Sequence, residues 1–255
     1  MTTSGSSSFN LDLNDLVEEA FERCGAELRT GYDLRTARRS LNLLTIEWAN
    51  RGINMWTIEQ GSIDLIQGIN TYDLPIDTID LLEQQIRTTS AQQNNQTDIT
   101  ISRISVSNYS TIPNKLSQGR PIQVWIQRMS GAKYPLPGPE GTDSVTGIDA
   151  PKITVWPTPD QGTALNPYYK FIYWRLRRIQ DAGNGVNTQD IPFRFVNCLV
   201  AGLAYYLSMK LPNMDMQRAV ALKAVYDEQF QLAADEDREK APIRFIPRMT
   251  FLGNS

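Results

Sequence analysis

The stretch Pro-Lys-Ile-Thr-Val-Trp-Pro-Thr-Pro-Asp occupies residues 151–160. Its β-branched run at 153–155 suits the pleated surface of a sheet. Pro157 and Pro159 lack the amide hydrogen that a continuing strand must donate, so a strand is predicted to end before them. This stretch decides the fold, because it places sheet structure in the middle of a chain whose two ends carry helical patterns.

Strand-like segments extend outward from this stretch in both directions. The hydrophobic period changes from helical to about two residues after Ile53. Of the 14 prolines, 11 lie between Pro75 and Pro192, where turns and edge strands tolerate them. The patterns predict strands at residues 55–58, 62–66, 71–75, 81–88, 97–104, 122–129, 153–156 and 168–176.

Two segments of this β-rich region are predicted to be something other than strand. Residues 106–112 neither alternate cleanly nor extend far enough for a strand, so a short helix ending at Pro113 is predicted. Residues 131–147 contain three prolines and several glycines. They are predicted to form a long loop, and long loops are often working surfaces.

Helical patterns occupy both ends of the chain. Apolar residues recur at helical spacing over about 11–24 and 33–51, and the short connection between them favours a helical hairpin. Helices are also predicted at about 192–210 and 214–238. The third of these four helices is apolar on nearly every face, so it lies either at the centre of its domain or between subunits.

These patterns predict an α+β fold, in which a helical bundle of N- and C-terminal helices carries a β-rich insert and an extended C-terminal tail. The predicted division is a flexible tail at 1–10, a helical domain from 11–52 and 190–240, an insert domain at 53–189, and a tail at 241–255.

Composition excludes several kinds of chemistry. The chain of 255 residues has no histidine and a formal net charge of -3. The missing histidine removes Ser-His-Asp and Cys-His catalysis and most zinc sites, and the charge argues against a dedicated nucleic-acid binder. Cys24 and Cys198 are predicted to be buried free thiols. No cofactor, metal site, secretion signal or membrane span is predicted.

Candidate catalytic groups lack a supporting context. The Ser-x-x-Lys pattern at 130–133 matches that of penicillin-recognising enzymes, but it lies at the mouth of the predicted loop and lacks the Lys-Thr-Gly partner. The carboxylate pairs Asp77 with Asp80 and Glu140 with Asp143 show no spacing that singles out an acid and a base, because solvated turn residues explain them as well.

Two groups of basic residues have the composition of nucleic-acid contacts. The segment 168–178 interleaves aromatic and basic residues, which suits either base stacking or, more simply, a strand buried on both faces. Arg29, Arg35, Arg38 and Arg39 form the second group. They suit a solvated helix face, an ion-pair network with a neighbouring subunit, or phosphate contacts.

The C-terminal segment from Pro242 to Ser255 is basic and apolar. Such a segment has nothing to bury against by itself, so it either packs back on its own domain or is captured by another chain.

In their order and spacing, several landmarks resemble the head-to-tail adaptor (connector) family of short-tailed bacteriophages, which includes tail tubular protein A and the tail accessory factor. The landmarks are Cys24-Gly25, the helix from Leu41 to Gly52, Tyr72-Asp73-Leu74-Pro75, Gly119-Arg120-Pro121, Ile153 to Asp160, and the apolar helix after Ile191-Pro192.

The resemblance implies a structural, non-enzymatic virion protein, assembled in the host cytoplasm. Such a protein is expected to form a ring of identical subunits, typically twelve, that joins the portal to the tail nozzle and passes double-stranded DNA without sequence-specific binding. The expected portal contacts are Ile243, Arg244, Phe245, Ile246, Pro247 and Arg248. The expected contacts with the nozzle or tail fibres are Tyr134, Pro135, Leu136 and Pro137. The alternative function is a phage tail-associated peptidoglycan hydrolase.

Overall fold

The structure is a computed structural model of the chain. It describes residues 5, 9–29, 31–53, 55–89, 96–130, 133–135, 146–183, 187–212 and 214–238. Over these residues the chain contains five α-helices and two four-stranded sheets, which confirms the predicted mixed α+β class. It divides into two compact units. We call Met1–Ser40 with Phe193–Ser255 the helical unit and Leu41–Pro192 the sheet unit.

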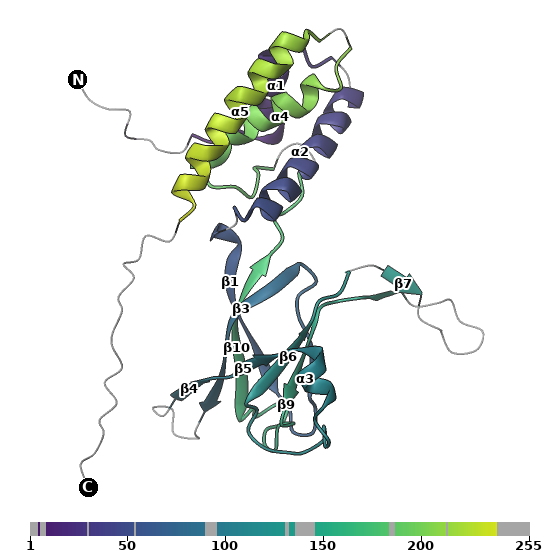
Figure 1. Cartoon of the computed structure of the whole chain (residues 1–255), viewed down its shortest axis with the longest axis vertical. Helices are drawn as coiled ribbons and strands as arrows, with labels where there is room; N and C mark the ends of the chain where they lie inside the picture. The colour runs from purple at the N-terminus through teal and green to yellow at the C-terminus, as the bar shows by residue number, and fades with distance from the viewer. Residues whose placement is uncertain are drawn as a thin grey trace. The chain divides into compact units, whose positions relative to one another are not determined.

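The helical unit contains α1 (Leu13–Cys24), α4 (Val196–Ser208) and α5 (Met216–Glu236). α1 begins after Asp12, whose side chain accepts a hydrogen bond from the Asp15 amide at 2.9 Å, and ends at Gly25 in the left-handed conformation. α4 packs against both α1 and α5 (Figure 1). A fourth helix, α2 (Gly31–Arg51), begins two residues before its predicted start and includes the division between the two units.

α4 is the central helix of this unit. Nine of its 13 residues are buried; Val196, Tyr205 and Tyr206 are partly exposed, and Asn197 is exposed. It begins at Val196, later than predicted, because the 3-10 helix η2 (Phe193–Phe195) precedes it. The sequence left two positions open for this helix, the centre of its domain or the interface between subunits. The structure shows the first, because α4 packs against helices of its own chain.

The sheet unit contains two four-stranded sheets that share one core. The first has the order β1 (Ile58–Leu65), β10 (Tyr169–Arg177), β3 (Thr78–Thr89) and β4 (Gln96–Thr100), all antiparallel. The second has the order β2 (Thr71–Asp73), β9 (Lys152–Trp156), β6 (Gln123–Gln127) and β5 (Ser102–Ile104), in which β5 and β6 are parallel. Leu65, Ile86 and Phe171 of the first sheet join Val124 and Ile153 of the second in a single hydrophobic cluster.

The stretch at 151–160 behaves as predicted. β9 ends at Trp156, directly before Pro157, and the bond between these two residues is cis. Beyond the strand, the Thr158 amide donates to Ser117 at 2.9 Å and its carbonyl accepts from Gly119 at 2.8 Å. The two family-like landmarks around Gly119 and Trp156 are therefore hydrogen-bonded to each other.

Several predicted elements differ from the observed ones. The strand predicted at 55–58 is mainly the 3-10 helix η1 (Met55–Thr57), and β1 runs without a break through the gap predicted at residues 59–61. The strand predicted at 97–104 divides at Ile101, which is 3% exposed, into β4 of one sheet and β5 of the other. The short helix was predicted correctly, as α3 (Val106–Ser110).

The predicted loop at 131–147 also contains strand structure. β7 (Lys133–Pro135) pairs with β8 (Thr146–Ile148) as an antiparallel ribbon. The prediction of a loop without strands was wrong at these two segments. It relied on the many turn residues, whereas the pairing of two strands is made by backbone hydrogen bonds.

Candidate functional site

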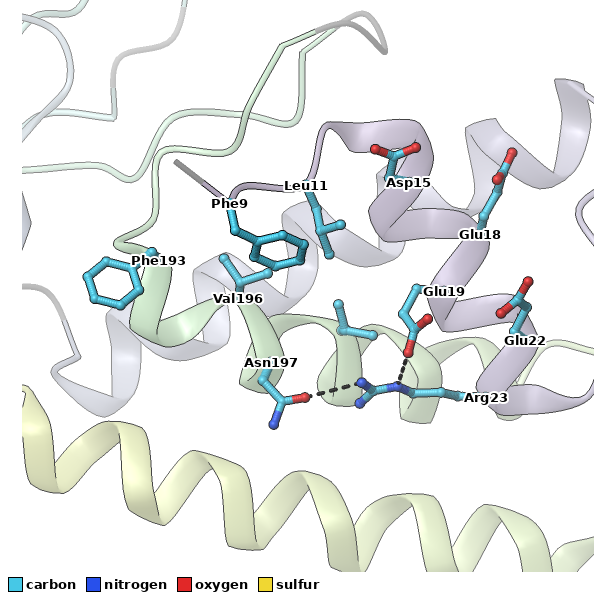
Figure 2. A pocket seen from close by; sticks show the side chains of 11 residues that line it. Phe9, Leu11, Asp15, Glu18, Glu19, Glu22, Arg23, Phe193, Val196 and Asn197 are labelled. Carbon is cyan, nitrogen blue, oxygen red and sulfur yellow. Dashed lines mark hydrogen bonds and ion pairs between the residues drawn. The ribbon is translucent and has the colours of Figure 1, made fainter. Parts of the chain in front are cut away.

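An open groove of about 540 Å³ crosses the helical unit between α1 and the start of α4 (Figure 2). Its apolar wall consists of Phe9, Leu11, Phe193, Val196 and Val200. Two of these side chains, Phe9 and Phe193, are largely exposed, whereas Val200 is buried. Large apolar side chains that gather around a hollow are typical of an interaction surface.

Carboxylates form the other wall of the groove. Asp15, Glu18 and Glu22 recur at helical spacing along α1, and all three are exposed. Among the described residues, no Lys or Arg side chain forms an ion pair with any of them. We call these three residues the acidic edge.

The remaining charges of the groove pair with each other. Arg23 donates to Glu19 at 2.9 Å and to Asn197 at 3.1 Å, and both contacts are visible in Figure 2. Asn197 also donates to Gln229 of α5 at 2.7 Å. This chain of hydrogen bonds links α1, α4 and α5 beside the groove. Within the described residues, the acidic edge is therefore the charged part of the groove that can bind a basic group of a partner.

α5 presents a second candidate surface. Its inner face buries Tyr226 and Ala233. Its outer face carries polar residues, but also the exposed apolar side chains of Met216, Val220, Val225 and Leu232. An outer face with this apolar content is a candidate interaction surface.

The arginines near the start of α2 make local contacts. Arg29 pairs with Glu27 at 3.3 Å, Arg35 donates to the Gly31 carbonyl at 3.3 Å, and Arg39 donates to Thr36 at 3.3 Å. All three side chains lie on an exposed surface, which matches the solvated-face interpretation.

Three of the four aromatic residues of β10 are core residues. Tyr169, Phe171 and Tyr173 all belong to the hydrophobic cluster of the sheet unit. Their rings cannot stack on bases from that position, so the strand interpretation of residues 168–178 was correct and the stacking interpretation was wrong.

The basic residues at the end of β10 are held in ion pairs. Arg175 contacts Glu59 at 2.9 Å and Asp77 at 2.5 Å, while Arg177 contacts Glu59 at 2.6 Å and Asp190 at 2.5 Å. Both arginine side chains are only 11% exposed. Hydrogen bonding to Asp190 raises the pKa of Arg177, although partial burial opposes it. These contacts tie β1, β10 and the chain before α4 together at one end of the sheet.

Asp77 and Asp80, the first candidate acid and base pair, also form ion pairs. Asp77 pairs with Arg175, whereas Asp80 accepts hydrogen bonds from Arg103 at 3.0 Å and from Arg128. Partial burial acts to raise the pKa of Asp80, but the hydrogen bonds from Arg103, Arg128 and the Leu81 amide outweigh it. The pKa of Asp80 therefore lies below its ordinary value, which is the opposite of what a general acid needs.

The other candidate groups were placed as follows. The Ser130 hydroxyl donates to Asp149 at 3.1 Å. Cys24 and Cys198 are buried free thiols, as predicted. Among the described residues there is no cluster of three His, Cys, Asp or Glu side chains that could hold a metal ion. Within the same residues, no helix is both long and apolar enough to span a bilayer.

The predicted partner contacts mostly lie outside the described residues. This holds for Ile243, Arg244, Phe245, Ile246, Pro247 and Arg248, and for Leu136 and Pro137. Tyr134 and Pro135 lie in β7, where Tyr134 pairs with Gly147. The groove was not predicted, although the spacing of its acidic edge along α1 was a signal available in the sequence.

Comparison with known families identifies the chain. The model of the SU10 adaptor protein family matches residues 11–245, which include all five helices and both sheets. The chain belongs to the SU10 adaptor protein family. No curated protein matched the sequence.

The match confirms the resemblance to phage head-tail adaptors. The groove and the exposed side chains of α5 are thus surfaces of an adaptor, a structural phage protein by its family. The matched range also extends past α5 to residue 245, so it includes the first part of the basic, apolar tail.

Proposed function

We propose that this adaptor forms a homo-oligomeric ring, of about twelve subunits, that joins the portal to the tail nozzle and continues the DNA channel at the head-tail junction of the virion. The observation that carries the proposal is the family match over residues 11–245. A ring requires heterologous contacts between neighbouring copies. The exposed apolar side chains of α5 and the groove offer two different surfaces for such contacts.

Within the subunit, the helices at 11–52 and 190–240 form a bundle that builds the ring wall, and residues 53–189 form an insert. α5 and the tail engage the portal, with contacts from Ile243 to Arg248. The ribbon of β7 and β8, with residues Tyr134 to Pro137, meets the nozzle or fibres. The central position of α4 supports this division of roles, because it leaves α5 as one of the two flanking helices, with an exposed outer face.

The DNA channel is proposed to be lined by acidic side chains. Asp235, Glu236, Asp237 and Glu239 cluster at the end of α5 and the start of the tail. Repulsion from such a cluster would keep DNA from adhering during ejection. The net charge of -3 agrees with DNA that passes through without being bound.

Electron microscopy tests the ring directly. Purified adaptor mixed with its portal is expected to add a ring-shaped layer to the portal. Adaptor that stays monomeric beside unchanged portals would contradict the proposal. Tight, salt-sensitive binding of DNA by the monomer would instead point to a nucleic-acid-binding role.

A truncated chain tests the role of the tail. A variant that ends before Pro242 is expected to fold, because the described helices and sheets all lie upstream, and to lose its place on the portal. If the truncated chain joins portals as well as the full chain does, the portal contacts assigned to Ile243–Arg248 are wrong.

A further inference from the structure

We propose that, in the subunit before assembly, the groove of the helical unit binds the C-terminal segment Ile243–Arg248 of the same chain. The proposal concerns the free subunit, so it does not depend on the ring or on the portal contacts proposed above. It follows from three properties of the groove and its surroundings: chemistry, spacing and proximity.

The chemistry of the groove and that of the segment are complementary. One wall is apolar, with Phe9, Phe193 and Val196, and the other carries the acidic edge, for which the described residues supply no cation. In the segment Ile-Arg-Phe-Ile-Pro-Arg, one set of alternate positions is wholly apolar, and the other set carries both arginines with Ile246 between them. In an extended chain, successive side chains point to opposite sides. Ile243 and Phe245 would then face the apolar wall while Arg244 and Arg248 face the carboxylates.

The spacing of the charges agrees with this arrangement. Asp15 and Glu22 are seven residues apart on α1, so they are separated by about 10.5 Å along the helix axis. Arg244 and Arg248 are four residues apart, which corresponds to about 13 Å in an extended chain. The flexible side chains of arginine and glutamate can span this difference. Pro242 and Pro247 favour an extended backbone in the residues that precede them.

The groove is also close to the point from which the segment departs. Glu236, the last residue of α5, lies 3.7 Å from Arg194, the neighbour of the groove residue Phe193. Only six residues, 237–242, separate Glu236 from Ile243, and six extended residues reach about 20 Å. A tether this short gives a local concentration in the millimolar range. The segment of the same chain therefore has an advantage over that of a second copy.

Photo-crosslinking of the full-length chain tests this placement. Phe193→p-benzoylphenylalanine puts the probe at the end of the groove, at a position that is 75% exposed. Met216→p-benzoylphenylalanine is the matched control, because that residue is 76% exposed in the same unit but lies outside the groove. Irradiation of dilute protein is expected to join position 193, and not 216, to the peptide containing residues 243–248 within single chains.

Two other crosslinking results would contradict the proposal. Crosslinked dimers joined through the tail would show that the groove takes the segment of another copy, and the absence of tail peptides at position 193 would show that the groove does not bind it. Either result overturns the proposal. Because no portal is present, neither result decides the ring proposal.

Charge reversal provides the second measurement. Asp15→Lys with Glu22→Lys is expected to lower the crosslink yield about three- to tenfold, as expected for the loss of two surface ion pairs. Added Arg244→Glu and Arg248→Glu should restore the yield. Asp227→Lys with Glu228→Lys, exposed on α5 away from the groove, should leave it unchanged. If the crosslink yield stays the same when the charges of the acidic edge are reversed, and again when Arg244 and Arg248 are reversed, the acidic edge does not bind the segment.

Discussion

Cys24 shows how burial controls the chemistry of a single side chain. Its thiol donates to the Ala204 carbonyl at 3.2 Å, and burial raises its pKa to about 11 despite the nearby positive charge of Arg218. At pH 8 only about one such thiol in a thousand is ionised, and the thiolate is the reactive form. We expect iodoacetamide at pH 8 to leave Cys24 unmodified in the native protein, as measured by mass spectrometry.

The control for this prediction is the same reaction in concentrated urea. There, both Cys24 and the equally buried Cys198 should be alkylated at the rate of a free cysteine. Rapid modification of Cys24 in the native protein would show that α1 separates from α4 easily, against the packing described above.

Asp80 makes the stability of the sheet unit dependent on pH. Its folded-state pKa is lowered, because hydrogen bonds from Arg103, Arg128 and the Leu81 amide outweigh partial burial. A lowered pKa stabilises the fold above the unfolded value near 3.9, and this contribution is lost as the pH falls through the folded-state pKa. Asp80→Asn is therefore expected to lower the free energy of unfolding by about 1 to 2 kcal/mol at pH 7. The difference from the native chain should shrink as the pH falls below 4.

Urea unfolding between pH 3 and pH 7 measures this effect. Asp73→Asn is the control, because Asp73 is 71% exposed and lies 3.6 Å from Lys152. That change is expected to alter the free energy of unfolding by less than about 0.5 kcal/mol. A difference for Asp80→Asn that stays constant down to pH 3 would mean that the carboxylate charge contributes nothing.

At the scale of the element, Gly61 explains why β1 is continuous. It lies directly opposite Tyr173 of β10, and the buried tyrosine ring covers it so closely that a Cβ there would lie 2.4 Å from the ring. An aromatic ring that covers a strand glycine stabilises the pairing. Gly61→Ala must displace this ring from the core, so we expect it to lower the free energy of unfolding by about 1 to 3 kcal/mol in urea.

Gly31→Ala is the matched change at a position with space. It lies at the start of α2, and a Cβ there would have nothing within 4 Å. Because alanine favours helix more than glycine does, this variant is expected to be neutral or slightly more stable. Equal destabilisation by both variants would show that the contact with Tyr173 is not responsible.

Elements with long hydrophobic patterns were predicted more accurately than elements with short ones. The helices were predicted within a few residues, because long apolar stripes such as Leu13 to Cys24 repeat over several turns. The break in β1 was predicted wrongly, since the ring that covers Gly61 comes from a strand more than 100 residues away. The division at Ile101 could not be predicted either, because an alternating pattern does not show that the chain passes from one sheet to another.

The groove was hidden for a related reason. Phe9 and Phe193 lie outside any periodic stripe, and they come together only because α1 packs beside α4. The acidic edge was visible in the sequence as carboxylates at helical spacing, but charged residues on a helix usually mark a solvated face. Only the apolar wall beside them distinguishes a binding surface from such a face.

At the scale of the whole molecule, the outer face of α5 connects the fold to assembly. Val220 and Leu232 are 63% and 57% exposed, so neither contributes much to the core of its own subunit. If the exposed parts of these side chains are buried at a contact in the ring, each contributes about 1 to 2 kcal/mol there. Replacing both with lysine removes this burial and places charge in the contact. We expect Val220→Lys with Leu232→Lys to keep the melting temperature within a few degrees while weakening ring formation at least about tenfold.

Gln217→Lys with Gln231→Lys is the control, because it adds the same charge to exposed polar positions of the same helix. Sedimentation velocity and electron microscopy with the portal would compare the three proteins. If the control assembles while the variant with Val220→Lys and Leu232→Lys stays monomeric, the α5 surface is a ring contact. If both variants assemble like the native chain, then α5 faces away from its neighbours, and the groove becomes the stronger candidate for the contact between subunits.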